Sequence, residues 1–252
     1  MLFFNENSTA AEHTFTSGVP LFSLIEAYSD TIDTAAWLLL LILFELETYV
    51  INDRWLTTRV KLWLLLIRSV SYVFIIYSLY GYLSRYINIL AADPIVIADT
   101  CALIGTDYTT IVTLNDYVPI TQELCQELNQ YNLIQMRDTL IIGSTTDYNI
   151  VKNLAMVDVI NASTWLLIVV ILEVDVFLKT HHAALSLLKK LTHCIKIALY
   201  CTLLVCAIYW GIDGDFLDFW DAFLWLIAFV FIEMNLFEWQ QELEQAKTRQ
   251  EP

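Results

Sequence analysis

Charge, glycine and proline are all scarce in this chain of 252 residues. Charged residues make up 16% of it, against about 25% in an average soluble domain. With six glycines and four prolines, long helices can run with few interruptions. There is too little charge to cover a soluble core, which excludes an ordinary soluble globular protein.

The familiar motifs of nucleotide binding and hydrolysis are also absent. The sequence has no Walker motif, no GxGxxG, no HExxH and no GxSxG. Residues 1–33 contain five acids and no lysine or arginine, whereas a signal peptide needs a basic start. We therefore expect no signal peptide, no enzymatic activity, no cofactor and no bound metal.

Hydrophobic residues dominate instead, at 58% of the chain and a mean hydropathy of +0.58. A membrane-spanning helix needs about 20 mostly apolar residues. Five segments fit this length, at 33–52, 62–85, 160–178, 194–211 and 217–237. The sequence thus predicts an all-α integral membrane protein in a lipid bilayer; the alternative is four spans with one segment lying on the membrane surface.

Basic residues set the expected orientation. Loops 53–61 and 179–193 and the tail 238–252 are rich in lysine and arginine, whereas loop 86–159 holds only two bases and Arg85 stands at its boundary. By the positive-inside rule, the N-terminal segment 1–32 is outside and the tail cytoplasmic, in a plasma or inner membrane. Tryptophans fit belts at the two interfaces: Trp37, Trp165, Trp210, Trp220 and Trp225 outside, and Trp55, Trp63 and Trp239 inside.

An internal repeat organises the predicted helices. Segment 35–83 aligns without gaps to 163–211, 128 residues later, and a third partial copy starts at Trp225. The expected architecture is two parallel-repeat hairpins, 33–85 and 160–211, plus a fifth helix with its outer loop at 212–237. Parallel repeats of this kind occur among transporters.

Each copy carries carboxylates at the same offset from its tryptophan. A glutamate follows the tryptophan after eight residues, and an acid or amide follows two residues later: Glu45 and Glu47, Glu173 and Asp175, Glu233 and Asn235. Ionisable groups inside a membrane span are costly and suggest function. Three interpretations stay open: acids marking where the spans surface, a structural ion-pair clamp, and a cation or proton site.

Two bases match two of these acid pairs. Arg68 lies 23 residues after Glu45, and Lys196 lies 23 residues after Glu173. Since each hairpin turns near the midpoint, acid and base should lie at a similar depth and pair. Acids outnumber bases, so we expect the surplus to be protonated, hydrated, paired with another subunit or occupied by a cation.

The long loop 86–159 is expected to form a small acidic α+β domain outside the membrane. It holds nine carboxylates and two bases, with β-like runs at 95–97, 109–114 and 139–142 and a helix from Thr121, its N-cap, to about Gln135. Cys101 and Cys125 lie in this domain, where an oxidising environment permits a disulfide. Cys194, Cys201 and Cys206 on the fourth helix are expected to be buried thiols.

These features favour a protein that forms or contributes to a cation or proton pathway, as a homo-oligomer or with a membrane partner. The acidic outer face concentrates cations and repels nucleic acid. The alternative is a non-catalytic scaffold, sensor or assembly subunit whose ion pairs lock helices and whose outer domain binds a partner. An enzyme would require the acids and histidines to converge on a metal.

Overall fold

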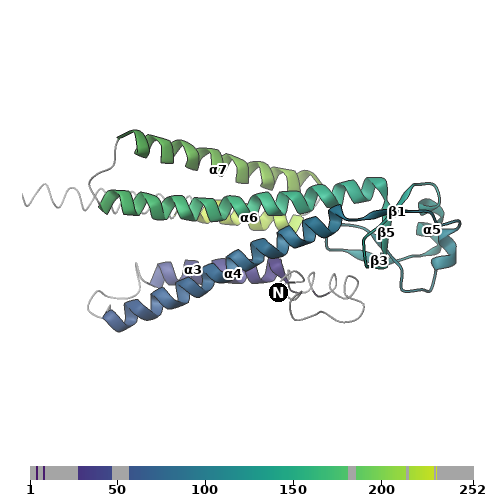
Figure 1. Cartoon of the computed structure of the whole chain (residues 1–252), viewed down its shortest axis with the longest axis horizontal. Helices are drawn as coiled ribbons and strands as arrows, with labels where there is room; N and C mark the ends of the chain where they lie inside the picture. The colour runs from purple at the N-terminus through teal and green to yellow at the C-terminus, as the bar shows by residue number, and fades with distance from the viewer. Residues whose placement is uncertain are drawn as a thin grey trace, which may run out of the picture. The chain divides into compact units, whose positions relative to one another are not determined.

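The computed structural model describes residues 4, 8, 28–46, 57–180, 186–213, 216–229 and 231, with the backbone alone at 44–45, 172–180 and 186–190. It is mostly helical, with one small sheet (Figure 1). The chain divides into two compact units, residues 1–159 and 160–252.

Three of the described helices are long and apolar enough to cross a membrane: Thr58–Leu90, Thr145–Ile171 and Leu191–Asp213. Their surfaces expose many large apolar side chains, Leu65, Phe74 and Ile197 among them, which suits a lipid environment. The two other expected spans fall on helix α3 (Ser29–Glu45) and on the helical residues 216–229. Both expected spans run on into residues that the structure does not describe.

Helix α4 (Thr58–Leu90) begins at an N-cap and carries one buried stripe. Thr57 Oγ1 accepts a hydrogen bond from the amide of Val60, which satisfies one free N–H of the first turn. The buried positions recur at intervals of three and four residues, so they share one face of the helix: Ser71, Ile75, Ser78, Gly81, Tyr82 and Ile89.

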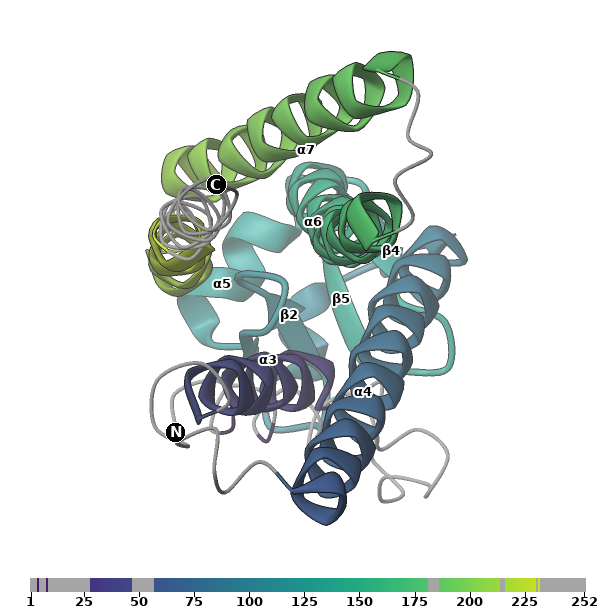
Figure 2. The same ribbon diagram turned by 90° about the vertical axis from the view of Figure 1, so that its left-hand side faces the viewer.

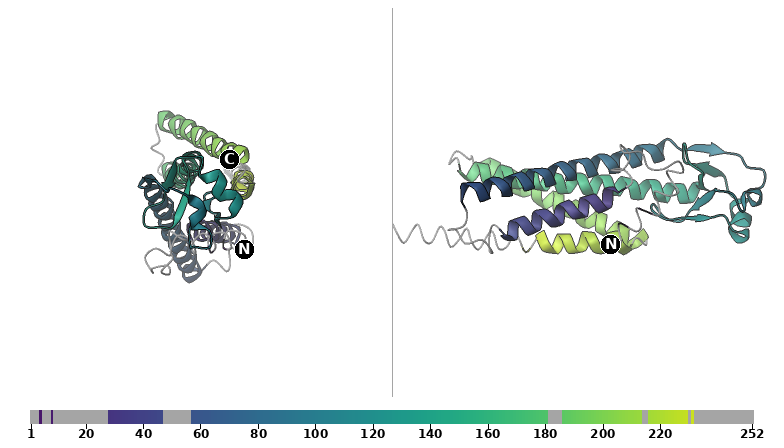
Figure 3. Two further views of the ribbon diagram at one scale, coloured as in Figure 1. Left: turned by 90° about the vertical axis from the view of Figure 1, so that its right-hand side faces the viewer. Right: turned by 90° about the horizontal axis from the view of Figure 1, so that it is seen from below.

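Small residues in this stripe let another helix approach closely, as is common in membrane bundles. Helix α3 packs against α4 (Figure 3). The hydroxyls of Ser71 and Ser78 donate to the carbonyl oxygens of Ile67 and Phe74 one turn earlier. Their burial therefore leaves no donor unsatisfied.

Between α4 and α6 (Thr145–Thr180) lies the sheet domain, which we define as residues 91–144. Its five strands are β1 (Asp93–Ile95), β2 (Thr109–Ile111), β3 (Tyr117–Pro119), β4 (Leu133–Gln135) and β5 (Ile141–Ser144). Their order is β1-β4-β5-β2-β3, with β2 and β5 parallel and all other pairs antiparallel. An α+β fold for this segment was expected, and the small sheet is present.

The sheet domain has its own core. Ile120, Leu128, Leu133 and Ile142 are buried around the fully buried Cys125, and helix α5 (Gln122–Leu128) lies beside the sheet (Figure 2). At Gly143 in strand β5, an added Cβ would lie 2.8 Å from Cδ1 of Ile111. That close approach explains the glycine at this position.

Local expectations for this domain were partly wrong. Thr121 is the N-cap of α5 and accepts from the amide of Leu124, as expected, but the helix ends at Leu128 and residues 133–135 form strand β4. Strand β1 covers 93–95 instead of 95–97, and β3 was not expected at all. Helix α6 already begins at Thr145, because Ser144 and Asp147 form a reciprocal capping box.

Candidate functional site

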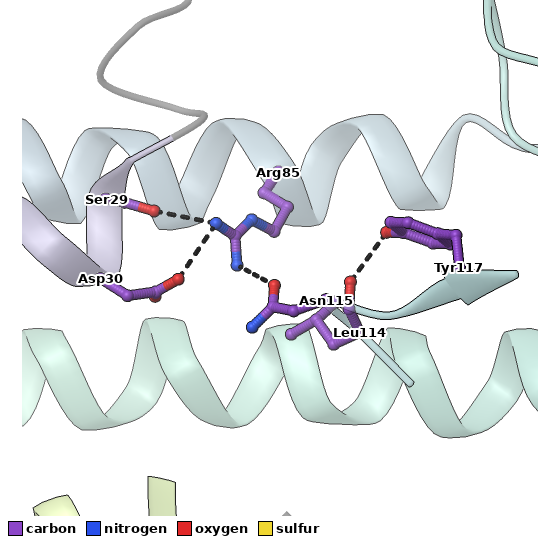
Figure 4. A network of polar contacts seen from close by, with 6 residues as sticks. All are labelled: Ser29, Asp30, Arg85, Leu114, Asn115 and Tyr117. Atoms are coloured by element: carbon purple, nitrogen blue, oxygen red, sulfur yellow. Dashed lines mark hydrogen bonds and ion pairs between the residues drawn. The ribbon is translucent and has the colours of Figure 1, made fainter. Parts of the chain in front are cut away.

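Arg85 lies at the centre of a buried polar network that joins three separate elements (Figure 4). Its Nη2 donates to Ser29 Oγ at 3.1 Å and lies 3.4 Å from Asp30 Oδ2, both at the start of α3. Its Nη1 donates to Asn115 Oδ1 at 3.2 Å, in the turn between β2 and β3. We call this set the Arg85 junction: Ser29, Asp30, Arg85 and Asn115.

The residues of the junction lie near the ends of helices and strands. Ser29 and Asp30 occupy the first turn of α3, where a carboxylate is favoured by the helix dipole. Asn115 is held by a tight turn in which the amides of Val112 and Thr113 donate to the carbonyl oxygen of Asp116. The guanidinium thus contacts a carboxylate of α3 and an amide oxygen of the sheet domain.

Tyr117 stabilises the turn from the domain side. Its hydroxyl donates to the carbonyl oxygen of Leu114 at 2.7 Å. Burial raises the pKa of Tyr117 to about 12, against the opposing effect of the Arg85 charge. The phenol therefore stays neutral and keeps donating throughout the physiological pH range.

The junction is buried and rich in acid. The side chains of Arg85 and Asp30 are 15% and 13% exposed, and Asp158 on α6 is 8% exposed. Arg85 interacts electrostatically with both Asp30 and Asp158. Removing one partner of an ion pair in such a poorly hydrated place is costly, because the remaining charge loses its compensation.

A disulfide joins Cys101 and Cys125, which confirms the expected bond. Around it, Thr100 Oγ1 donates to the carbonyl oxygen of Cys125 at 2.7 Å, and the amide of Thr100 donates to Asn129 Oδ1 at 2.8 Å. Hydrogen bonds from Asn129 and from the amide of Cys101 hold the pKa of Asp99 below its usual value. These contacts fix the 3₁₀ turn η3 (Thr100–Leu103) against α5.

The carboxylates singled out in the sequence lie at the edge of what the structure describes. Glu45 is the last residue of α3, and Glu173 and Asp175 belong to α6, each by backbone alone. Glu47, Glu233 and Asn235 lie outside the described residues. Arg68 and Lys196 are half-buried on α4 and α7 (Ser186–Asp213), and their pairing with these acids stays a prediction.

The structure bears on two further expectations from the sequence, concerning a metal site and the tryptophan belts. Among the described residues, no group of three or more histidine, cysteine or acidic side chains converges as a metal site would require. Of the expected belt tryptophans, Trp63 and Trp220 are exposed, whereas Trp37, Trp165 and Trp210 are buried. The buried three pack within the protein, and their position in a membrane stays a prediction.

Sequence reasoning did not single out Ser29, Asp30, Asn115 or Asp158, and it read Arg85 only as a span boundary. One signal was available. Asp30 and Asp158 each stand seven residues before the tryptophan that opens a repeat copy, just beyond the aligned segment. Ser29 and Asn115 carry no such signal, because only the folded chain brings them to Arg85.

None of the known protein families, curated proteins or solved structures compared with this chain matches it.

Proposed function

We propose that this protein is a non-catalytic membrane receptor or assembly subunit. In this proposal, the sheet domain binds a partner on one side of the membrane and the Arg85 junction fixes that domain to the helices. The observation that carries it is the single guanidinium bonded both to the turn of the sheet domain and to the start of α3.

The Arg85 junction couples movements of the sheet domain to movements of α3. A movement of the β2–β3 turn would pull Asn115 from Arg85 and break the hydrogen bond between Arg85 Nη1 and Asn115 Oδ1. Leaving a buried polar group unpaired costs about 1–3 kcal/mol. A partner bound to the domain can therefore shift the equilibrium between alternative positions of α3 by a free energy of this order.

The surface of the domain suggests the kind of partner. Five acids of the domain are exposed: Asp107, Asp116, Glu123, Glu127 and Asp138. Residues 91–144 contain one base, Arg137, and it pairs with Asp93 at 3.3 Å. Such a surface attracts a basic partner and accelerates its association at low salt.

Photo-crosslinking in native membranes tests this proposal. A photoreactive residue placed at Gln126, next to Glu127 on α5, should give one specific adduct. The adduct should vanish in a Glu123→Lys/Glu127→Lys protein and persist in the matched Glu123→Gln/Glu127→Gln protein at low salt, though weaker. No adduct, or one insensitive to charge reversal, would contradict partner binding through this face.

A second candidate function is a cation or proton pathway, favoured by the repeated carboxylates of the helices. Among them, Glu233 stands in the third copy at the same offset from its tryptophan as Glu45 and Glu173. Protein reconstituted in liposomes should then carry a cation or proton flux that Glu233→Gln reduces while folding is kept. Absence of flux, or flux unchanged by this substitution, would leave the receptor or assembly role alone.

A further inference from the structure

The three repeat copies share more than their tryptophan and glutamate. An aspartate stands seven residues before each tryptophan, as Asp30, Asp158 and Asp218. An acid or amide stands four residues before it, as Asp33, Asn161 and Asp221. The extended pattern is D-x-x-[DN]-x-x-x-W, with a glutamate eight residues after the tryptophan. Each copy thus has two groups of polar residues, one on each side of an apolar stretch, which we call its polar levels.

Burial supports the equivalence of the first two copies. Five pairs of residues 128 positions apart are buried in both copies, on both helices of each hairpin. The matched buried pairs are Ala36 and Thr164, Trp37 and Trp165, Ile75 and Leu203, Ser78 and Cys206, and Tyr82 and Trp210. Chance similarity of apolar segments does not explain a match that includes polar and aromatic residues at the same helical face.

The distance between the two polar levels is too short for both to reach water. From Asp33 to Glu45 a helix rises about 18 Å, whereas the hydrocarbon core of a bilayer is about 30 Å thick. The same holds from Asn161 to Glu173. At least one polar level of each copy therefore lies at hydrocarbon depth, where a carboxylate requires protonation, a partner or protein cover.

At the level nearer to the sheet domain, one base among the described residues, Arg85, interacts with an aspartate from each of two copies. Arg85 pairs with Asp30 of the first copy and interacts electrostatically with Asp158 of the second. The position equivalent to Arg85 in the second hairpin, 128 residues later, is Asp213, which is exposed. The other titratable groups that act on Arg85 are Tyr82 and Tyr117.

We propose that Arg85 neutralises the equivalent aspartates of two repeat copies at once, Asp30 and Asp158, and so sets the register of α3, α4 and the 145–159 part of α6. Asp158 is then a positioning residue that acts through Arg85. This role holds whatever partner the sheet domain binds.

The test compares charge removal with charge rebalancing in the full chain, purified in detergent or nanodiscs. Arg85→Gln should lower the Tm by about 6–20 °C, because it leaves two buried carboxylates without their base. The triple protein Arg85→Gln/Asp30→Asn/Asp158→Asn should regain at least half of that loss. Arg137→Gln, which removes a base from an exposed ion pair, should change the Tm little.

A pH series separates charge balance from simple loss of hydrogen bonds. In Arg85→Gln, Asp30 and Asp158 have lost the guanidinium, so their ionised forms should destabilise the fold. The loss of Tm should therefore be small at low pH, where carboxyl groups are protonated, and should grow as the pH rises. The triple protein should show no such loss between pH 4 and 8, roughly the range in which buried carboxyl groups titrate.

Two outcomes overturn the proposal. One is that Arg85→Gln/Asp30→Asn regains as much as the triple protein, which would make Asp158 irrelevant to Arg85. The other is that neither aspartate substitution restores stability. If Arg85→Gln yields no folded protein, recovery of monodisperse triple protein is the supporting result and its failure the contradicting one.

Discussion

The sheet domain and the membrane helices are held together in different ways. In the domain, contacts join residues far apart in sequence: a disulfide spans 24 residues, and Thr100 bonds to Asn129. In the helices, burial follows a short repeating interval, as on α4 from Ser71 to Tyr82. A few residues therefore dominate the stability of the domain, whereas many positions share it in the helices.

Removing the disulfide should give the largest effect within the domain. Cys125→Ala releases a loop whose closure is worth about 3 kcal/mol, and measured losses for native disulfides run to about 5 kcal/mol. Since Cys125 is fully buried and Cys101 half-buried, Cys125→Ala should cost slightly more than Cys101→Ala. Protease resistance of residues 91–144 and the free energy of unfolding in urea measure the loss.

The matched control for that experiment is Cys206→Ala on α7. Its thiol is also buried but is not cross-linked, so the substitution removes one buried sulfur atom without opening a cross-link, at a cost of about 1 kcal/mol. An equal loss in both proteins would mean that the cross-link adds nothing and that the domain does not depend on it.

Alkaline pH should weaken the domain through Tyr117. Its folded pKa of about 12 lies above the usual value of 10, so the stability it contributes is complete below pH 10 and is lost as the pH rises to about 12. The difference of two units corresponds to about 2–3 kcal/mol. Unfolding curves of Tyr117→Phe should lack this part of the alkaline loss, whereas Tyr131→Phe, at an exposed site, should follow the wild type.

The same contrast explains what the sequence could and could not predict. Apolar length located α4, α6 and α7, because a membrane helix is specified by its own residues. The N-cap at Thr121 and the disulfide were also predictable, since each depends on one residue or one pair. Strands β3 and β4 were missed because three-residue strands carry almost no periodic signal. Their pairing with β1, β2 and β5 stabilises them.

The candidate site likewise contains residues that the sequence could predict and residues that it could not. The repeat made Asp158 accessible to sequence analysis, had the alignment been extended seven residues before Trp165. Asn115 was not predictable, because a turn between two short strands brings it to Arg85 over a separation of 30 residues. The charge pattern alone placed Arg85 at a membrane boundary and gave no indication that it bonds to Ser29, Asp30 and Asn115.

On the helix side, overpacking one position should have a moderate effect. Ser78→Leu adds two heavy atoms at a fully buried position of α4, and overpacking typically costs about 1–3 kcal/mol. Ser69→Leu is the matched control, since Ser69 makes the same hydroxyl bond to the carbonyl four residues earlier but is exposed. Thermal unfolding in detergent should show a lower Tm for Ser78→Leu alone; equal Tm values would indicate that this face is loosely packed.

The smallest effect should come from the helix of residues 216–229, where Trp225 donates from Nε1 to Asp221 Oδ1 at 3.2 Å. Trp225→Phe keeps a ring against Phe229, whose centroid lies 6.4 Å away, and removes this hydrogen bond. A bond to a carboxylate is worth about 1.5–3 kcal/mol when buried. At this half-exposed site we expect a loss of about 1 kcal/mol or less.

Trp220→Phe provides the comparison, because that indole packs among Phe216, Phe219 and Phe223 and a phenyl ring preserves most of the packing. Its Tm should stay within about 2 °C of the wild type, as surface substitutions usually do. A loss at Trp225 larger than that of Ser78→Leu would contradict distributed stability in the helices. It would instead place a dominant contact at the aspartate–tryptophan pair, and Asp33–Trp37 would then be the next pair to substitute, since it has the same spacing in the first copy.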